Sequence, residues 1–248
     1  MVLDGHRRDW EDLGELDPFW AILTTQRGKF GGWNLEEFFA TGRAEMKAVM
    51  ANALDLGYPH GRMRALDFGC GVGRLTQALS EYFDESWGID IAEAMISKAR
   101  LRNSARQNCK FMVYNGENLS VFEDNFFDLV YTSLVLQHIP STSLVLSYIA
   151  EFIRVLRKNG LLIFQLPTHL PLRFKLQLHR RLYTVLRLIG IKKEFLYRKA
   201  GFYPIRLTSV SSESVLRVVR DCAGRVLKVE PDTRCGSLIE SRTYYATK

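Results

Sequence analysis

The sequence predicts an α/β fold in which strands of a parallel sheet alternate with helical crossovers. From Ala65 onward, short apolar runs alternate with segments of helical period. The first run ends on Asp67 and is followed at once by a glycine-rich turn. A second run ends on Asp90, one helix and one strand later. In such a sheet the strand ends meet at one edge, where open α/β sheets bind small molecules.

Residues 1–62 are expected to form a helical, aromatic-rich region ahead of the sheet. Asn34, with Glu37 three residues later, predicts a helix N-terminus, and the apolar spacing carries this helix toward Leu54. Glycines in Arg27-Gly28-Lys29 and at 31–32 interrupt the region before the helix. Two roles stay open for the region: a helical layer that packs on the sheet, or a lid that closes over a site.

Residues 63–248 are expected to form one domain. The predicted strands span 64–68, 86–90, 110–115, 127–133, 161–166, 226–230 and 242–247. The predicted helices span 74–83, 92–103, 143–158 and 213–223. Asn159-Gly160 is expected to end the third helix, and Pro167 to stop the strand that follows it.

Glycines stand at alternate positions in the turn after the first strand, at Gly69, Gly71 and Gly73. Glycine allows positive φ and leaves no Cβ in the way of a ligand. The spacing departs from the dinucleotide pattern G-x-G-x-x-G, because Arg74 stands where its third glycine belongs, and no Lys-Ser/Thr follows as in a P-loop. Asp67 would repel a pyrophosphate, so the turn suits a cationic or hydroxyl-bearing ligand.

The run Asp67-Phe-Gly-Cys-Gly-Val-Gly73 resembles motif I of the class I S-adenosylmethionine (SAM) methyltransferases, small-molecule type. The resemblance covers residues 64–166 and returns at 209–248. It implies a Rossmann-like three-layer α/β/α sandwich with a seven-stranded, mostly parallel sheet whose last strand is antiparallel. It also implies transfer of the SAM methyl group, with S-adenosylhomocysteine (SAH) as the product.

The strand ends supply the candidate cofactor contacts. Asp90 lies 23 residues after Asp67, beside the glycine turn, where an acid accepts both ribose hydroxyls; its other reading is a helix N-cap. Asn115 stands where the family has an acid for the adenine amine, and its oxygen can still accept that bond, although Asn115-Gly116 also suits a simple turn. The full candidate set is Asp67, Gly69, Cys70, Gly71, Gly73, Arg74, Asp90, Ile91, Asn115, Gly116, Glu117, Ser133, Leu134 and Arg43.

Within this set, the resemblance places Ser133 and Leu134 at the methionine end of the cofactor. Arg43 and Arg74 are candidates for the cofactor's carboxylate or, alternatively, surface ion-pair residues. His138 follows in the same turn and would lie near the methyl group. It has two readings, a general base toward the acceptor or a hydrogen-bonded structural histidine.

The acceptor is expected to be a small or lipid-like molecule, methylated on oxygen or nitrogen. Thr132-Ser-Leu-Val135 lacks the Asn/Asp-Pro-Pro-Tyr/Phe motif of base amino-methylating enzymes, and no proline precedes a cysteine as in the RNA cytosine-5 enzymes. No acid cluster indicates a metal site. The alternatives are an RNA, tRNA or protein methyltransferase and a SAM-binding module without catalysis.

Residues 168–206 break the repeat and read as a basic amphipathic helical insert. Three roles stay open: a solvated helical cap, a cover for a hydrophobic acceptor, or contact with an anionic membrane surface or nucleic acid. We expect no nucleic-acid partner, and a monomer or homodimer. The net charge is +7, no apolar run reaches the roughly 18–20 residues of a membrane span, and the four cysteines form no C-x-x-C pair. With no signal peptide in view, a cytoplasmic setting is expected.

Overall fold

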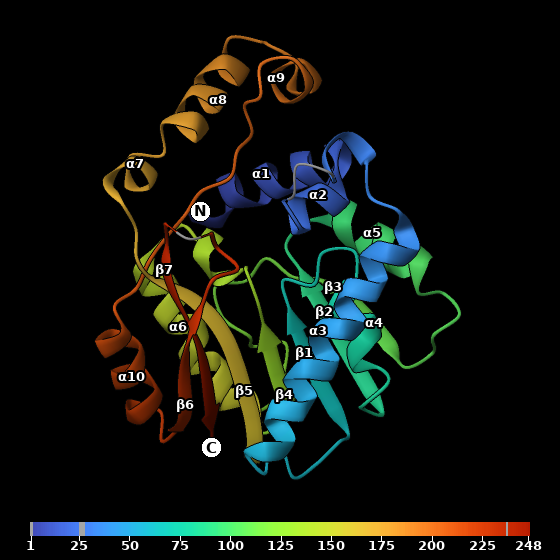
Figure 1. Ribbon diagram of the computed structural model, residues 1–248, viewed down its shortest axis with the longest axis vertical. Helices are drawn as coiled ribbons and strands as arrows, with labels where there is room; N and C mark the ends of the chain where they lie inside the picture. Colours follow the sequence, from blue (N-terminus) through green and yellow to red (C-terminus); the bar gives the residue numbers. More distant parts are fainter. Residues whose placement is uncertain (1, 25–27, 237) are drawn as a thin grey trace.

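A seven-stranded sheet forms the centre of the protein (Figure 1). The computed structural model describes residues 2–24, 28–236 and 238–248. The strand order is β3-β2-β1-β4-β5-β7-β6, and β7 runs antiparallel to both neighbours. The strands are β1 (Arg64–Phe68), β2 (Glu85–Asp90), β3 (Cys109–Val113), β4 (Phe127–Thr132), β5 (Leu156–His169), β6 (Arg225–Asp232) and β7 (Glu240–Thr247). The predicted sheet is confirmed, including its antiparallel last strand.

Helices cover both faces of the sheet, because its strands are apolar on both sides. Leu66 and Val130 face one helical layer, whereas their neighbours Ala65 and Leu129 face the other. One layer contains α6 (Thr142–Val155) and α10 (Ser212–Asp221), and the other contains α3 (Leu35–Asp55), α4 (Arg74–Leu79) and α5 (Glu93–Arg102). The three-layer sandwich predicted from the sequence is therefore confirmed.

The N-terminal helices lie at the end of the sheet where the parallel strands finish (Figure 1). They are α1 (Val2–Leu16) and α2 (Pro18–Ile22). Leu13 and Trp20 pack with Met95 of α5 in a hydrophobic cluster of their own. The Asn34 side chain accepts hydrogen bonds from the N–H groups of Glu36 and Glu37, which confirms the predicted start of α3. Arg27, in the predicted glycine hinge, lies outside the described residues.

The insert forms three helices, of which α8 and α9 lie above α1 and α7 lies beside it in Figure 1. They are α7 (Leu172–Lys175), α8 (Leu178–Leu188) and α9 (Lys193–Arg198). Ion pairs tie them to α1: Arg180 contacts Asp9 at 2.8 Å, and Lys193 contacts Asp12 at 2.9 Å. No helix within the described residues is both long enough and apolar enough to span a bilayer.

Two predicted boundaries around the fifth strand are wrong. Helix α6 ends at Val155 rather than at 158, and β5 runs from Leu156 through Asn159 and Pro167. Leu156 pairs with Phe127 of β4, and that pairing overrides the helical spacing of 156–158. Pro167 lies beyond the end of β4, where β5 pairs with β7 alone, so a residue without an N–H is tolerated there.

Candidate active site

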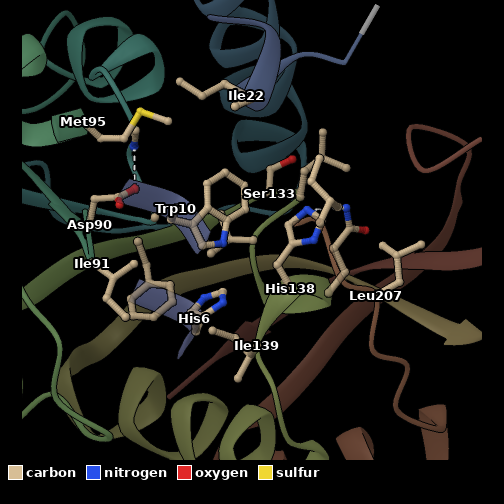
Figure 2. A pocket seen from close by; sticks show the side chains of 18 of the residues that line it. His6, Trp10, Ile22, Asp90, Ile91, Met95, Ser133, His138, Ile139 and Leu207 are labelled. Atoms are coloured by element: carbon tan, nitrogen blue, oxygen red, sulfur yellow. Dashed lines mark hydrogen bonds between the residues drawn. The ribbon is translucent and has the colours of Figure 1, made fainter. Parts of the chain in front are cut away.

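A cavity of about 360 Å³ lies at the carboxyl ends of β1, β2 and β4. This volume falls in the range of small-molecule sites. Figure 2 shows Asp90 and Ile91 on one side of the cavity and Ser133 and His138 on the other. The N-terminal helices and the insert complete the wall, because α1, α2 and α7 each contribute lining residues.

Two of the three turn glycines line the cavity. Gly69 and Gly71 have φ of +77° and +54°, and a Cβ on either would lie within about 2.5 Å of Val135 or Ile22. Gly73 instead caps α4 in the left-handed conformation, and a Cβ there would lie 2.8 Å from the ring of Phe111. The turn therefore presents two glycines to a ligand, and Gly73 lets the turn pack against β3.

Of the other motif I side chains, Phe68 lines the cavity, whereas Asp67 and Cys70 do not. Cys70 is buried with its Sγ 2.9 Å from where a Cβ of Gly88 would lie. Asp67 is buried beneath the turn and accepts a 2.7 Å hydrogen bond from the Thr76 hydroxyl. Burial raises the pKa of Asp67 to about 7. Neither side chain is among those that line the cavity.

Asp90 accepts hydrogen bonds from two backbone N–H groups and also lines the cavity. One carboxylate oxygen accepts the N–H of Gly71 and the other accepts the N–H of Ala92 at the start of α5, each at 2.9 Å. Its carboxylate also lines the cavity, as does the next residue, Ile91. Burial raises the pKa of Asp90, and the hydrogen bonds from backbone N–H groups oppose that shift. A carboxylate has about four acceptor positions, so two remain for a ligand.

The predicted arginines lie outside the cavity. Arg43 is exposed on α3, and Arg74 is buried in a 2.8 Å ion pair with Glu45. Among the described residues, Arg234 is the only Lys or Arg that lines the cavity. Its guanidinium donates to the Ser133 hydroxyl at 2.7 Å and pairs with Glu45 at 3.1 Å. Sequence reasoning missed Arg234, because only the return of β7 beside β5 brings it to the site.

In the turn after β3, the residue that lines the cavity is the one before the predicted adenine contacts at 115–117. Tyr114 lines the cavity, whereas Asn115, Gly116 and Glu117 do not. The Gly116 carbonyl accepts a 2.6 Å hydrogen bond from the Tyr148 hydroxyl, which fixes this turn against α6. The adenine contacts at 115–117 stay predictions.

The turn after β4 does reach the cavity. Ser133 and Leu134 both line it, and their contact with the methionine end of the cofactor stays a prediction. Leu134 has φ of +61°, and its N–H donates to the Gln165 side chain at 3.0 Å. This bond holds the residue in the left-handed region, which a leucine rarely adopts.

His138 lines the cavity, but protein atoms engage both of its ring nitrogens. Nδ1 lies 2.6 Å from the Arg206 carbonyl and therefore carries the proton. Nε2 then accepts from the amide of Gln137 at 3.2 Å, whose oxygen in turn accepts from the Cys235 thiol. Burial lowers the pKa of His138 to about 4. These contacts agree with the role of a hydrogen-bonded structural histidine.

A second histidine, His6 of α1, also lines the cavity, and sequence reasoning missed it. It is 4% exposed, and burial lowers its pKa to about 3. Within the described parts of the chain, its ring nitrogens make no hydrogen bond. Trp10, one turn further along α1, contacts both imidazoles, with ring centroids 6.3 Å from His6 and 5.3 Å from His138 (Figure 2). The spacing of His6 and Trp10 indicated a shared helix face but not what that face covers.

The cavity has the chemistry that SAM requires. Exposed turn backbone at Gly69 and Gly71 lies next to the spare acceptor positions of Asp90. The apolar side chains of Ile91 and Met95 lie on the same side as Asp90 (Figure 2). Arg234 brings a guanidinium to Ser133 on the other side, where Glu45 and Asp232 also pair with it. The residues present therefore fit a nucleoside joined to a charged amino acid.

Comparisons with known proteins agree with this assignment. Residues 66–164 match the family described as "Methyltransferase domain". A ubiquinone biosynthesis O-methyltransferase of Xanthomonas oryzae pv. oryzae is 27% identical over 131 residues, 50% of this chain and 54% of that protein. CymA of Salinispora arenicola, described as a nonribosomal peptide synthetase, is 28% identical over 166 residues, 64% of this chain. That match spans 2% of CymA, so the chain covers only part of the curated relatives it matches.

A solved structure shares the whole fold. Magnesium protoporphyrin IX methyltransferase (ChlM) of Synechocystis PCC 6803, solved with bound SAH, aligns with a TM-score of 0.63. The two chains are 20% identical, and the alignment covers 98% of each. Residues 66–164 therefore carry a methyltransferase domain, and the strand order and the glycine turn with Asp90 beside it have the class I, Rossmann-like arrangement.

Proposed function

We propose that the protein transfers the methyl group of SAM to a small, largely apolar acceptor that carries a hydroxyl or an amine. The observation that carries this proposal is the cavity itself, which joins the glycine turn and Asp90 to apolar side chains and to His6. The likeness to ubiquinone biosynthesis O-methyltransferases supports oxygen as the methylated atom.

The cofactor half of the proposed site uses Gly69, Gly71, Asp90 and Arg234. When bound, SAM supplies an electrophilic methyl group. The turn backbone lies along the ligand, and the two spare acceptor positions of Asp90 hold the ribose hydroxyls. Arg234 holds the carboxylate in place of the arginines expected from the sequence, because it is the arginine that lines the cavity among the residues that the structure describes.

The proposed acceptor half is largely apolar, and its polar groups include His6, Gln137 and His138. Its proposed lining residues are Leu3, Trp10, Ile139, Phe174, Leu207 and Ile239. These side chains bind an apolar molecule and exclude water, which strengthens polar contacts within the site. His6 lines this half of the cavity, so we propose it as the base for the acceptor's O–H or N–H. Burial lowers its pKa, so it takes the proton only as the acceptor's oxygen or nitrogen forms its new bond.

We further propose that residues 1–62 act as a lid together with the insert at 168–206, both attached to the methyltransferase domain at 63–248. Phe174 of the insert and Trp10 of α1 line the same cavity. The Tyr197 hydroxyl donates to Asp17 at 2.8 Å, so the two segments are joined to each other as well as to the site. A ligand that enters beneath them would require both to move together.

Labelling with SAM that carries a tritiated methyl group tests the proposal. The purified protein is incubated with a small-molecule extract, with total RNA and with denatured protein in separate reactions. We expect SAH to form and the label to enter a small molecule soluble in organic solvent. Label in RNA or in protein would overturn the acceptor assignment. SAM binding without SAH formation in any reaction would make the chain a binding module.

A further inference from the structure

Helix α8 packs in the opposite sense to most surface helices, with its charged side inward. Arg180 forms a 2.8 Å ion pair with Asp9 of α1, and Tyr183 donates to Asp12 at 2.8 Å. Arg187 also approaches Asp12, at 3.9 Å. An amphipathic helix usually buries its apolar stripe against the protein. Here the acidic side of α1 holds the basic side of α8, which leaves the apolar stripe of α8 turned outward.

The outward stripe consists of large apolar side chains at helical spacing. The outer surface is formed by Leu178, Leu182, Val185, Leu188 and Ile189, which are between 42% and 81% exposed. Leu172 of α7 and Leu176, the residue after this helix, are also exposed. Exposed apolar side chains gathered on one face mark an interaction site rather than ordinary surface. We call the exposed residues of 172–192 the outer face.

Positive charge surrounds the outer face. Residues 168–206 contain ten Lys and Arg and a single acid, Glu194, against a net charge of +7 for the whole chain. The rest of the chain therefore carries a slight net negative charge. Arg173, Lys175, Arg181 and Lys192 are exposed, and no ion pair to them is found among the described residues. An apolar stripe flanked by unpaired Lys and Arg is complementary to an anionic lipid surface.

We propose that the outer face docks on a bilayer that contains anionic phospholipid. Leu182, Val185 and Leu188 enter the boundary between head groups and acyl chains, while Arg181 and Lys192 lie at the phosphates. The apolar centre of the face distinguishes this surface from a nucleic-acid site, where phosphate contacts dominate. Phe174 joins the face to the cavity wall, so docking places the proposed acceptor site beside the membrane.

Vesicle flotation without SAM tests the docking separately from methyl transfer. We expect the wild-type protein to float with vesicles that contain phosphatidylglycerol and not with pure phosphatidylcholine vesicles. The triple change Leu182→Asp, Val185→Asp and Leu188→Asp should abolish flotation. The matched control replaces exposed apolar residues elsewhere, Leu54→Asp, Leu101→Asp and Val121→Asp, and should float like the wild type.

A charge pair provides a second, gentler test. Each Lys or Arg near an anionic surface contributes a factor of about 5 to partitioning, so Arg181→Gln with Lys192→Gln should weaken vesicle binding about 25-fold. Lys47→Gln with Lys158→Gln removes two exposed charges elsewhere and should have little effect. All of these variants should keep the wild-type SAH affinity, because none of the substituted residues lines the cavity. They should also keep the wild-type melting temperature, because all of the substituted residues are exposed.

Three results would overturn the docking. One is a wild-type protein that does not bind vesicles containing phosphatidylglycerol. Another is an equal loss of binding in the control variants. The third is a wild-type dimer that the triple change converts to a monomer, with no vesicle binding in either form, since the face would then pair with a second copy. If the triple variant does not fold, the charge pair decides the question.

Discussion

The two cavity histidines predict a steep loss of stability in mild acid. Burial lowers the pKa of His6 to about 3 and that of His138 to about 4, from an ordinary value of 6.5. Both imidazoles are therefore neutral in the folded protein at pH 5, whereas the unfolded chain protonates them. A proton that binds only the unfolded state stabilises it, so this contribution to folding is lost as pH falls below 6.5.

The size of the effect follows from the distance between pH 5 and the unfolded pKa. That distance is about 1.5 pH units, which corresponds to roughly 2 kcal/mol per histidine and roughly 4 kcal/mol for the pair. Asp67 acts in the opposite sense, because its raised pKa, about 7, lets the folded state take up a proton on acidification. The comparison of variants with wild type isolates the histidines from Asp67.

The assay is urea unfolding at pH 7 and pH 5. His6→Asn and His138→Asn each remove one imidazole and should each reduce the loss of unfolding free energy between these pH values by roughly 2 kcal/mol. His169→Asn removes an exposed imidazole and should keep the wild-type difference. Burial of a neutral His6 would be refuted if His6→Asn lost as much free energy between pH 7 and pH 5 as the wild type.

Three further variants test the site. His6→Asn should lower kcat about 100-fold while SAH affinity stays unchanged. A kcat equal to that of the wild type would show that His6 is not the base. Arg234→Met should weaken SAH binding about tenfold. Arg242→Met changes a half-exposed arginine on β7 that does not line the cavity, and it should keep the wild-type affinity; equal affinities in both variants would show that Arg234 does not hold the carboxylate. Gly71→Ala forces a side chain to φ of +54° and 2.5 Å from Ile22, so melting temperature and SAH affinity should both fall. Wild-type values would show that the turn has room.

Local sequence predicted those parts of the site that belong to the repeating strand–helix unit. The ends of β1 and β2 are neighbours because Asp67 pairs with Gly88 in parallel register, which is what the spacing to Asp90 implied. The positions of Gly69 and Gly71 follow from the same unit. Asp90 was read as either a ribose ligand or a helix cap, and its geometry accommodates both roles, since one carboxylate has enough acceptor positions.

Sequence could not predict the groups that long-range packing brings to the cavity. His6 lies on α1, which is far from the first strand in sequence, and Arg234 lies on the connection between β6 and β7. Neither lies in a motif with fixed spacing to Asp67. The boundary of α6 failed for a similar reason, because pairing of Leu156 with β4 depends on a strand almost thirty residues away. Tertiary contacts override local spacing at such positions.

The most direct test of the account is SAH binding measured by calorimetry on the wild type, Asp90→Asn and Asp67→Asn. An amide at position 90 has one oxygen for two backbone N–H groups and a ligand, so SAH affinity should fall at least about tenfold. Asp67→Asn changes a more deeply buried acid that does not line the cavity, so SAH affinity should stay near wild type even if stability falls. Wild-type affinity in Asp90→Asn would contradict the proposed cofactor site.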